Sequence, residues 1–163
     1  MMAYRVGILT LSDKGAQGLR EDRSGARIAE IMKAAGYEIA FAELLPDDLE
    51  RIKAFLTEKC DGNACDLLLT TGGTGFSERD VTPEATCAAM ERNVPGIAEA
   101  MRAASLKITP RAMLSRGVSG IRKKTLIVNL PGSVRAVEEN LDAALPAFQH
   151  GLGILSGKEG ECG

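Results

Sequence analysis

The sequence predicts a single α/β domain built on a mostly parallel sheet with helices on both faces. Three apolar runs of strand length, at 4–11, 66–71 and 124–130, are separated by segments with helical periodicity. Strands that alternate with helices usually pair in parallel and need a helical layer on each face. With 163 residues, the chain has the length of one domain and buries roughly two-thirds of its unfolded surface.

The first half of the chain predicts three strands and two helices. In order, we expect a strand at 4–11, a polar loop at 12–22, a helix at 23–35, a strand at 37–43, a helix at 46–59 and a strand at 66–71. The first helix carries Ile28, Ile31 and Met32 on one face, and Gly36 ends it. The second strand is predicted from its alternating pattern.

The second half predicts three more helices and a buried strand. We expect helices at 82–92 and 97–107, an irregular segment at 108–123 with a short strand at 117–121, a strand at 124–130, and a last helix after Ser133. Pro146 lies inside this last helix and is expected to kink it. We assign residues 1–156 to the domain and 157–163 to a flexible tail.

Composition and charge exclude several classes of function. The net charge of −2 gives no electrostatic reason to bind nucleic acid or a membrane surface, and the absence of Trp argues against a base-stacking platform. No apolar run reaches membrane-spanning length, and no targeting segment precedes the first strand. The four cysteines are Cys60, Cys65, Cys87 and Cys162, and their spacing fits neither a CxxC pair nor a zinc knuckle. We therefore expect a cytoplasmic protein in which these thiols are reduced. Cys87 lies in the predicted helix 82–92 and is expected to be a packing residue of the protein interior, not a catalytic thiol.

The most informative stretch is the strand 66–71 and the glycine-rich turn Gly72-Gly73-Thr74-Gly75 that ends it. Glycines let backbone N–H groups crowd around an anion, and the helix that follows adds a favourable partial charge. Thr70, Thr71 and Thr74 supply hydroxyl donors. The pattern predicts a phosphate site; the alternative is a tight strand-to-helix turn without a ligand.

Polar turns follow four of the predicted strands: Ser12-Asp13, Pro46-Asp47, the segment 72–80 and the segment 129–133. In parallel sheets, ligands bind beyond the carboxyl ends of the strands. We therefore expect these turns to meet at one edge and to form a single active site. The turn Asn129-Leu130-Pro131-Gly132-Ser133 repeats the strand–glycine–helix arrangement and could bind a second anion or the edge of a heterocycle.

Asp47 and Asp80 are candidate catalytic carboxylates at this edge. Two carboxylates beside an anion site repel the ligand unless a divalent cation lies between them, which points to Mg²⁺. Asp47 has an alternative role, because Glu50 follows it at the spacing of a capping box. An Asx turn is the alternative for Asp80, since Thr82 before Pro83 is expected to cap the next helix.

Basic residues near the turns are candidate phosphate ligands. Arg79 can neutralise an anion, and Arg116 can fork onto a phosphate to which Ser115 also hydrogen-bonds. The alternative for Ser115-Arg116 is a surface loop. His150, the single histidine, is expected on the surface of the last helix, and without a nucleophile–base pair no hydrolase triad is expected.

Three stretches then carry a family resemblance: TTGGTGFSERDVTPEAT (70–86), VPGIAEAMRAASLKITPRAMLSRGVSGIR (94–122) and IVNLPGS (127–133). In this order they closely resemble the molybdopterin adenylyltransferases of molybdenum cofactor biosynthesis, which include stand-alone bacterial proteins and a domain of plant and animal fusion proteins. The similarity covers roughly residues 4–156 and extends to the segments 12–25 and 44–53. The second domain of the fused proteins is not in this chain.

The resemblance implies a three-layer α/β/α sandwich, assembled as a homotrimer. It also implies transfer of AMP from Mg-ATP to the terminal phosphate of molybdopterin, giving adenylylated molybdopterin and pyrophosphate. A separate molybdate-insertion protein would use the product and could contact this one. A non-catalytic molybdopterin-binding carrier is the alternative, and the presence of both aspartates favours the enzyme.

By the same resemblance, Asp47, Asp80 and Ser115 are catalytic, and the two aspartates hold magnesium. Ser115 matches a serine implicated in pterin binding or turnover. The substrate-binding residues that we expect are Ser12, Asp13, Thr71, Gly72, Gly73, Thr74, Gly75, Arg79, Arg116, Asn129, Pro131 and Gly132.

Overall fold

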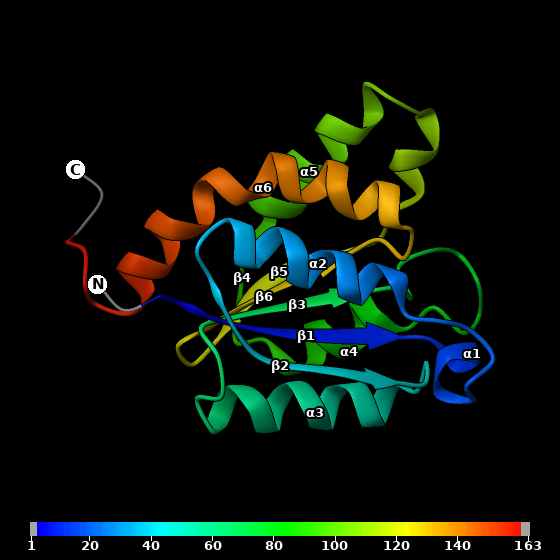
Figure 1. The fold of residues 1–163 in the computed structure, drawn as a ribbon, viewed down its shortest axis with the longest axis horizontal. Helices are drawn as coiled ribbons and strands as arrows, with labels where there is room; N and C mark the ends of the chain where they lie inside the picture. The colour runs from blue at the N-terminus through cyan, green and yellow to red at the C-terminus, as the bar shows by residue number, and fades with distance from the viewer. Residues whose placement is uncertain (1–2, 161–163) are drawn as a thin grey trace.

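A computed structural model describes residues 3–160 as one six-stranded mixed sheet with strand order β2-β1-β3-β6-β5-β4 (Figure 1). The strands β2, β1, β3 and β6 pair in parallel, and β5 and β4 extend the β6 edge antiparallel. The strands are β1 (Arg5–Leu11), β2 (Glu38–Leu45), β3 (Leu67–Thr71), β4 (Arg92–Asn93), β5 (Ser119–Arg122) and β6 (Thr125–Leu130). The mostly parallel sheet confirms the predicted fold class.

Helices cover both faces of this sheet, as expected for a three-layer α/β/α sandwich. In Figure 1, α2 and α6 lie on one side of the sheet and α3 lies on the other. The helices are α1 (Asp13–Ala16), α2 (Arg23–Ala34), α3 (Leu49–Asp61), α4 (Thr82–Ala89), α5 (Pro95–Leu106) and α6 (Val134–Leu155), with a 3₁₀ helix η1 (Pro110–Leu114).

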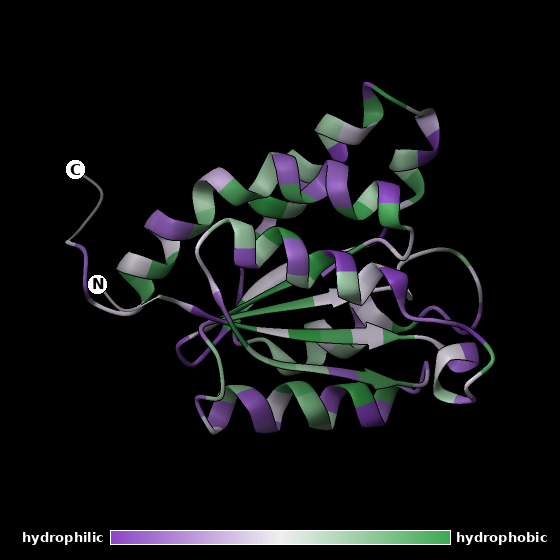
Figure 2. Ribbon diagram, in the orientation of Figure 1, coloured by the Kyte–Doolittle hydropathy of each residue, from purple (hydrophilic) through white to green (hydrophobic). Residues whose placement is uncertain are grey.

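Alternate residues of the central strands supply two separate cores. Val6 and Ile8 of β1 pack with α2, α5 and α6, whereas Leu9 and Leu11 pack with α3 and α4. The same alternation divides the side chains of β3 and β6. Figure 2 shows the consequence, since the outer helices carry both purple and green residues while β1 and β3 are mostly green or pale.

The long elements match the expected ones, and several short ones were missed. The expected loop 12–22 contains the one-turn helix α1, and the expected irregular segment 108–123 contains η1 before β5. The two-residue strand β4 was not expected, and α4 ends at Ala89 rather than at 92. At Met90 the backbone becomes extended and runs into β4, which pairs with β5.

The structure rules out the capping alternative for Asp47 and shows that the expected Thr82 cap is wrong. Asp48, not Asp47, caps α3 and accepts the backbone N–H of Arg51 at 2.9 Å. Val81 is the N-cap residue of α4, and the Thr82 hydroxyl instead donates to the carbonyl of Gly72 at 3.0 Å. Each observed N-cap residue lies one position away from the cap considered in the sequence, which leaves the Asp47 carboxylate free of a capping role.

Residues 158 and 159, which follow the last helix, contact the domain. α6 continues through Pro146 as one element. Glu159, in the predicted tail, pairs with His150 at 2.7 Å, and Lys158 lies over the Tyr4 ring at 5.0 Å. Residues 161–163, with Cys162, lie outside the described residues. The domain boundary and the flexibility of the tail stay predictions.

Of the described thiols, Cys60 and Cys65 are buried and Cys87 is exposed, so the prediction that Cys87 packs inside is wrong. Cys87 lies on the outer side of α4, whose Ala85 and Ala89 face the core.

Within residues 3–160, none of the helices combines the length and the apolar character that crossing a bilayer requires.

Candidate active site

A cavity of about 840 Å³ opens at the carboxyl ends of the parallel strands. Turns that follow β1, β2, β3 and β6 all line it, which confirms the expected convergence on one edge. Asp47 and Asp80 both line this cavity. The other predicted residues that line it are Ser12, Asp13, Thr71, Gly72, Gly73, Arg79 and Gly132.

Asp13 and Asp47 join the turns after β1 and β2 through reciprocal hydrogen bonds. The backbone N–H of Asp13 donates to Asp47 Oδ2 at 3.0 Å, and the backbone N–H of Asp47 donates to Asp13 Oδ1 at 2.9 Å. Each carboxylate is therefore held by the backbone of the other turn. The pair fixes the Asp47 side chain at the cavity wall.

The second carboxylate oxygen of Asp47 has no protein partner. Among residues 3–160, Asp47 Oδ1 is the only buried side-chain nitrogen or oxygen without a hydrogen bond. Burial raises the pKa of the Asp47 carboxyl group; the hydrogen bond from the Asp13 backbone opposes this shift, and the charges of Asp13 and Asp80 add smaller raising effects. A buried acceptor of this kind is costly unless a ligand or cation meets it.

Arg79 reaches the same cavity and is paired with Asp13. Its Nε and Nη2 atoms donate to the two Asp13 oxygens at 2.9 and 3.0 Å, a bidentate ion pair. These bonds, followed by the one from the Asp47 backbone, lower the pKa of the Asp13 carboxyl group. Because the Arg79 side chain is 63% exposed, its remaining donors stay accessible to an anionic ligand.

The glycine turn adopts a backbone that other residues rarely take. Gly72 and Gly73 have φ values of +97° and +69°. A Cβ on Gly72 would lie 2.5 Å from the carbonyl oxygen of Leu11, and one on Gly73 would meet Thr82 Oγ1 and lie 3.1 Å from Asp47 Oδ1. The turn thus brings its backbone close to the unpartnered carboxylate oxygen. Its glycines also leave the backbone open to close approach by a phosphate.

Two helix N-termini also border the cavity. Arg23 and Ser24 at the start of α2, and Ser133 and Val134 at the start of α6, line it. N-terminal N–H groups and the helix dipole favour anions at such places. The cavity can therefore accept several negative charges despite its carboxylates.

Sequence reasoning missed the basic residues on the wall formed by the segment 14–23. Lys14, Arg20 and Arg23 line the cavity together with Asp22, whose carboxylate caps α2 and accepts the Thr10 hydroxyl at 2.7 Å. The signal in the sequence was three cations within ten residues of a loop between a strand and a helix. The predicted polar loop at 12–22 contains these cations but does not by itself show that they face a cavity.

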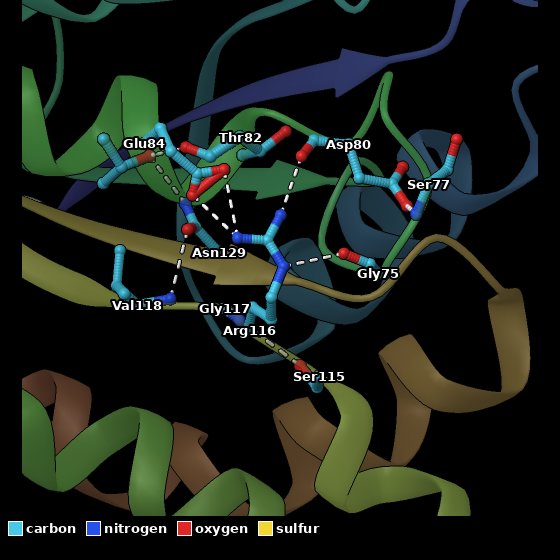
Figure 3. Close-up of polar contacts among 11 residues, drawn as sticks. Gly75, Ser77, Asp80, Thr82, Glu84, Ser115, Arg116, Gly117, Val118 and Asn129 are labelled. Atoms are coloured by element: carbon cyan, nitrogen blue, oxygen red, sulfur yellow. Dashed lines mark hydrogen bonds and ion pairs between the residues drawn. The ribbon is translucent and has the colours of Figure 1, made fainter.

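Asp80 is half-buried and directly follows the exposed residues 76–79. Its Oδ2 accepts the backbone N–H of Ser77 at 3.0 Å, and its own N–H donates to the Ser77 carbonyl at 3.0 Å (Figure 3). Asp80 thus has a local structural role as well as a place at the cavity. Within residues 3–160 no side chain or backbone group hydrogen-bonds to its Oδ1, so that oxygen is available to a ligand.

Arg116 and Asn129 line neither of the cavities described for residues 3–160. The Arg116 guanidinium is engaged by the carbonyls of Gly75 and Asp80 and by Glu84. The Asn129 side chain is buried: its amide nitrogen donates to the Thr70 and Thr86 hydroxyls, and its oxygen accepts the Val118 N–H. Figure 3 shows Arg116 bonded to Gly75, Asp80 and Glu84, and Asn129 bonded to Val118. Whether either one touches a substrate stays a prediction.

A second cavity of about 470 Å³ lies on the other side of the glycine turn. The predicted residues Thr74, Gly75, Ser115 and Pro131 line it. Basic, acidic, polar and apolar side chains also line it, and these were not singled out from the sequence: Phe76, Arg102, Arg111, Leu114, Glu139 and Asn140. The predicted site is thus divided between two cavities that share the turn 72–75 as their common wall.

Comparison with known proteins assigns the family. A family described as "Probable molybdopterin binding domain" matches residues 7–150, which include both cavities' predicted residues. The chain belongs to this family. The match runs from β1 into α6 and thus covers the whole sheet.

Individual relatives agree with this membership. The chain is 40% identical to a molybdopterin adenylyltransferase of Helicobacter pylori, over 96% of this chain and 90% of that one. It is 44% identical to gephyrin of Dictyostelium discoideum over 94% of its own length, but it spans only 23% of gephyrin. A crystal structure of a molybdopterin biosynthesis enzyme from Thermus thermophilus superposes with a TM-score of 0.89 at 49% identity, covering 97% of this chain and 99% of that one.

Proposed function

We propose that this protein is a molybdopterin adenylyltransferase, which transfers AMP from ATP to the terminal phosphate of molybdopterin and releases pyrophosphate. Family membership and full-length relatives of this activity support the proposal. The observation that carries it is the unpartnered Asp47 Oδ1 in one cavity with Asp80 and the glycine turn. Phosphoryl-type transfer needs this combination of anion-binding backbone and metal-binding carboxylate.

The residues of the first cavity fit a magnesium ion shared with a nucleotide. Asp47 Oδ1 is an oxygen donor without a hydrogen bond, and Asp80 is close enough to raise the Asp47 pKa. Among the residues described here, no cluster of three or more acidic, His or Cys side chains could hold a metal alone. Mg²⁺ characteristically takes one or two carboxylates and completes its shell with phosphate oxygens and water. Bound there, it would neutralise charge on the reacting phosphates.

The side chains and backbone around the first cavity position the reactants. Asp13 holds Asp47 at the wall, and Arg79, held by Asp13, offers its free donors to phosphate oxygens. Lys14, Arg20 and Arg23 lie where they can bind the leaving pyrophosphate. The attacking nucleophile is a phosphate oxygen of molybdopterin, so no protein nucleophile is needed.

The second cavity is proposed to hold the pterin. It adjoins the glycine turn, so a phosphate bound at that turn would connect a ligand in one cavity with a nucleotide in the other. Ser115 supplies a hydroxyl, Arg102 and Arg111 supply donors, and Phe76 and Leu114 supply apolar area. Ser115 is therefore proposed to orient the pterin.

The remaining predictions about partners are also proposals. Assembly as a homotrimer and contact with a molybdate-insertion protein rest on the family resemblance. Cytoplasmic localisation fits the reduced thiols expected from the sequence.

The direct test is to incubate the purified full-length protein with molybdopterin and Mg-ATP and to analyse the pterin product by mass spectrometry. We expect a product heavier by one adenylyl group, with release of pyrophosphate. Asp80→Asn should lower the rate more than ~100-fold, because losing a metal-holding carboxylate raises the barrier by at least ~3 kcal/mol. Near-normal turnover by a folded Asp80→Asn variant would contradict this role.

The same assay distinguishes the alternative, a molybdopterin-binding carrier without catalysis. A carrier would bind molybdopterin and leave its mass unchanged in the presence of Mg-ATP. It would also give no function to the unpartnered Asp47 oxygen.

A further inference from the structure

We propose that Arg116 is a positioning residue that sets Asp80 in the first cavity, rather than a ligand of the substrate phosphate. The proposal rests on the proposed function, because it concerns how that site is held in shape. It assigns a matching role to Glu84, which lines neither cavity and was not among the predicted site residues.

The Arg116 side chain closes the segment between Gly75 and Asp80 (Figure 3). Its Nε donates to the Gly75 carbonyl at 2.8 Å, and its Nη2 donates to the Asp80 carbonyl at 2.7 Å. The two ends of this segment are therefore tied to one rigid, planar group. The backbone N–H of Arg116 also donates to the Thr74 carbonyl at 2.9 Å, just before the segment begins.

Glu84 orients the guanidinium from the first turn of α4. Its two carboxylate oxygens accept Arg116 Nη1 at 3.0 and 2.7 Å. This ion pair raises the pKa of the Arg116 guanidinium still further above neutral pH. Every nitrogen of the guanidinium is thus engaged by protein oxygen atoms.

The segment has few other ties, so the contribution of Arg116 is large. Residues 76–79 are exposed, and the hydrogen bonds within the segment are local ones between Ser77, Arg79 and Asp80. Arg79 is also tied to Asp13 across the cavity. Without Arg116 the two ends of the segment can separate, and the Asp80 carboxylate can move away from Asp47. A displacement of about 1 Å of a reacting or metal-holding group can cost ~100-fold in rate.

Arg116 also connects the two cavities. Its neighbour Ser115 lines the second cavity, whereas Asp80 lines the first. The guanidinium therefore spans the wall between the proposed pterin and nucleotide sites. This placement makes the geometry of Asp80 depend on the segment that contacts the pterin.

The test compares Arg116→Met, Glu84→Gln and the double variant in steady-state kinetics of the full-length protein. For Arg116→Met we expect kcat to fall about 10- to 100-fold, with KM for ATP and for molybdopterin changed less than about threefold and with more Mg²⁺ needed for half-maximal rate. Glu84→Gln should lower kcat by about threefold, and the double variant should be no slower than Arg116→Met because both changes act through one group.

Arg27→Met is the matched control, because Arg27 also pairs with two carboxylates, those of Glu30 and Glu138, and lines neither cavity. It should leave kcat unchanged. If Arg116 instead binds a substrate phosphate, Arg116→Met raises the KM for that substrate at least as much as it lowers kcat, and the Mg²⁺ requirement stays unchanged. That pattern would overturn the proposal.

A second readout does not depend on catalysis. Hydrogen–deuterium exchange of the amides at 76–80 should be faster in Arg116→Met and Glu84→Gln than in the wild type and unchanged in Arg27→Met. Unchanged exchange at 76–80 in both site variants would refute the positioning role. If Arg116→Met does not fold, Arg116→Lys, which keeps the charge but loses the planar fork, replaces it. If the wild type transfers no adenylyl group, the proposed function fails, while the exchange result still decides the role of Arg116.

Discussion

Asp47 combines a firm anchor on one carboxylate oxygen with a buried, unpartnered oxygen on the other. The anchor is the backbone N–H of Asp13, and the free oxygen faces the glycine turn at Gly73. Burial and two neighbouring carboxylates oppose its ionisation and raise its pKa. A residue held in this unfavourable state is typical of a binding or catalytic site, where stability is given up for function.

Asp47→Asn should therefore stabilise the protein without ligand while it removes activity. At neutral pH the charged carboxylate is buried at a cost, and the amide removes that charge, so we expect a gain of about 1 kcal/mol in the free energy of unfolding. The folded-state pKa of Asp47 is raised, so in the wild type stability falls as pH rises from the unfolded-state pKa through the folded-state pKa. The higher unfolding free energy of Asp47→Asn relative to the wild type should thus be present at pH 7 and vanish once the wild-type carboxyl group is protonated in acid.

Denaturant unfolding at several pH values measures this difference. Asp48→Asn is the matched control, because Asp48 is exposed and asparagine also caps helices, so stability and activity should stay close to the wild type. A destabilised Asp47→Asn variant at pH 7 would show that the carboxylate stabilises the fold and would contradict this account.

The candidate residues show what a sequence can and cannot specify. Both aspartates lie in the first cavity as expected, because each follows a strand of a parallel sheet. The sequence could not tell Asp47 from Asp48 as the cap, since either carboxylate can precede the helix and only the backbone conformation decides. It also could not show that Arg116 points at carbonyls of a segment far away in the chain.

The turn between β3 and α4 is the element on which both cavities depend. Gly72 and Gly73 give it a backbone with positive φ, and the Thr82 hydroxyl ties the start of α4 to the Gly72 carbonyl. The turn therefore has a fixed shape before any ligand arrives. This agrees with the general need for preorganised donors in phosphoryl transfer.

Gly73→Ala should damage this element more than its positive φ alone predicts. The added Cβ would meet Thr82 Oγ1 and lie 3.1 Å from Asp47 Oδ1. We expect a loss of about 2 kcal/mol in unfolding free energy and more than about 10-fold in activity, because backbone strain and displaced site groups add together. Thermal unfolding and steady-state kinetics measure the two effects.

Gly18→Ala is the control for Gly73→Ala, because it adds backbone strain without a close contact. Gly18 has a similar φ of +73°, but nothing lies within 4 Å of an added Cβ. Gly18→Ala should lower the free energy of unfolding by only the cost of backbone strain, about 1 kcal/mol, and should leave activity unchanged. Equal effects of the two substitutions would mean that the close approach at Gly73 has no importance.

The long elements could be predicted from the sequence, and the short ones could not. Long strands and helices could be predicted, because their apolar patterns extend over enough residues to be distinctive. The short α1, β4 and η1 could not, since each depends on tertiary contacts: β4 exists through its pairing with β5, and α1 lies against the Asp13–Asp47 connection. Helix ends were off by one to three residues where caps and side-chain bonds decide the boundary.

In the whole molecule, function depends on strand order, which brings the turns after β1, β2, β3 and β6 to one edge. The order β2-β1-β3-β6 places β1 and β3 at the centre of the parallel part, and their turns meet at the first cavity. The sequence predicted that the turns converge but not the order of the strands, nor the antiparallel edge of β5 and β4. The division of the site into two cavities also became visible only in three dimensions.

The central claim is that Asp47 and Asp80 share one divalent cation with a bound nucleotide. The most direct measurement is a Mn²⁺ titration followed by electron paramagnetic resonance, using the full-length protein with and without an ATP analogue that has a methylene bridge between its α and β phosphates. We predict about one Mn²⁺ bound per chain only when the analogue is present, with affinity weakened at least about 10-fold in both Asp47→Asn and Asp80→Asn and unchanged in Asp48→Asn. Nucleotide-dependent Mn²⁺ binding that is as tight in Asp47→Asn and Asp80→Asn as in the wild type would contradict the account.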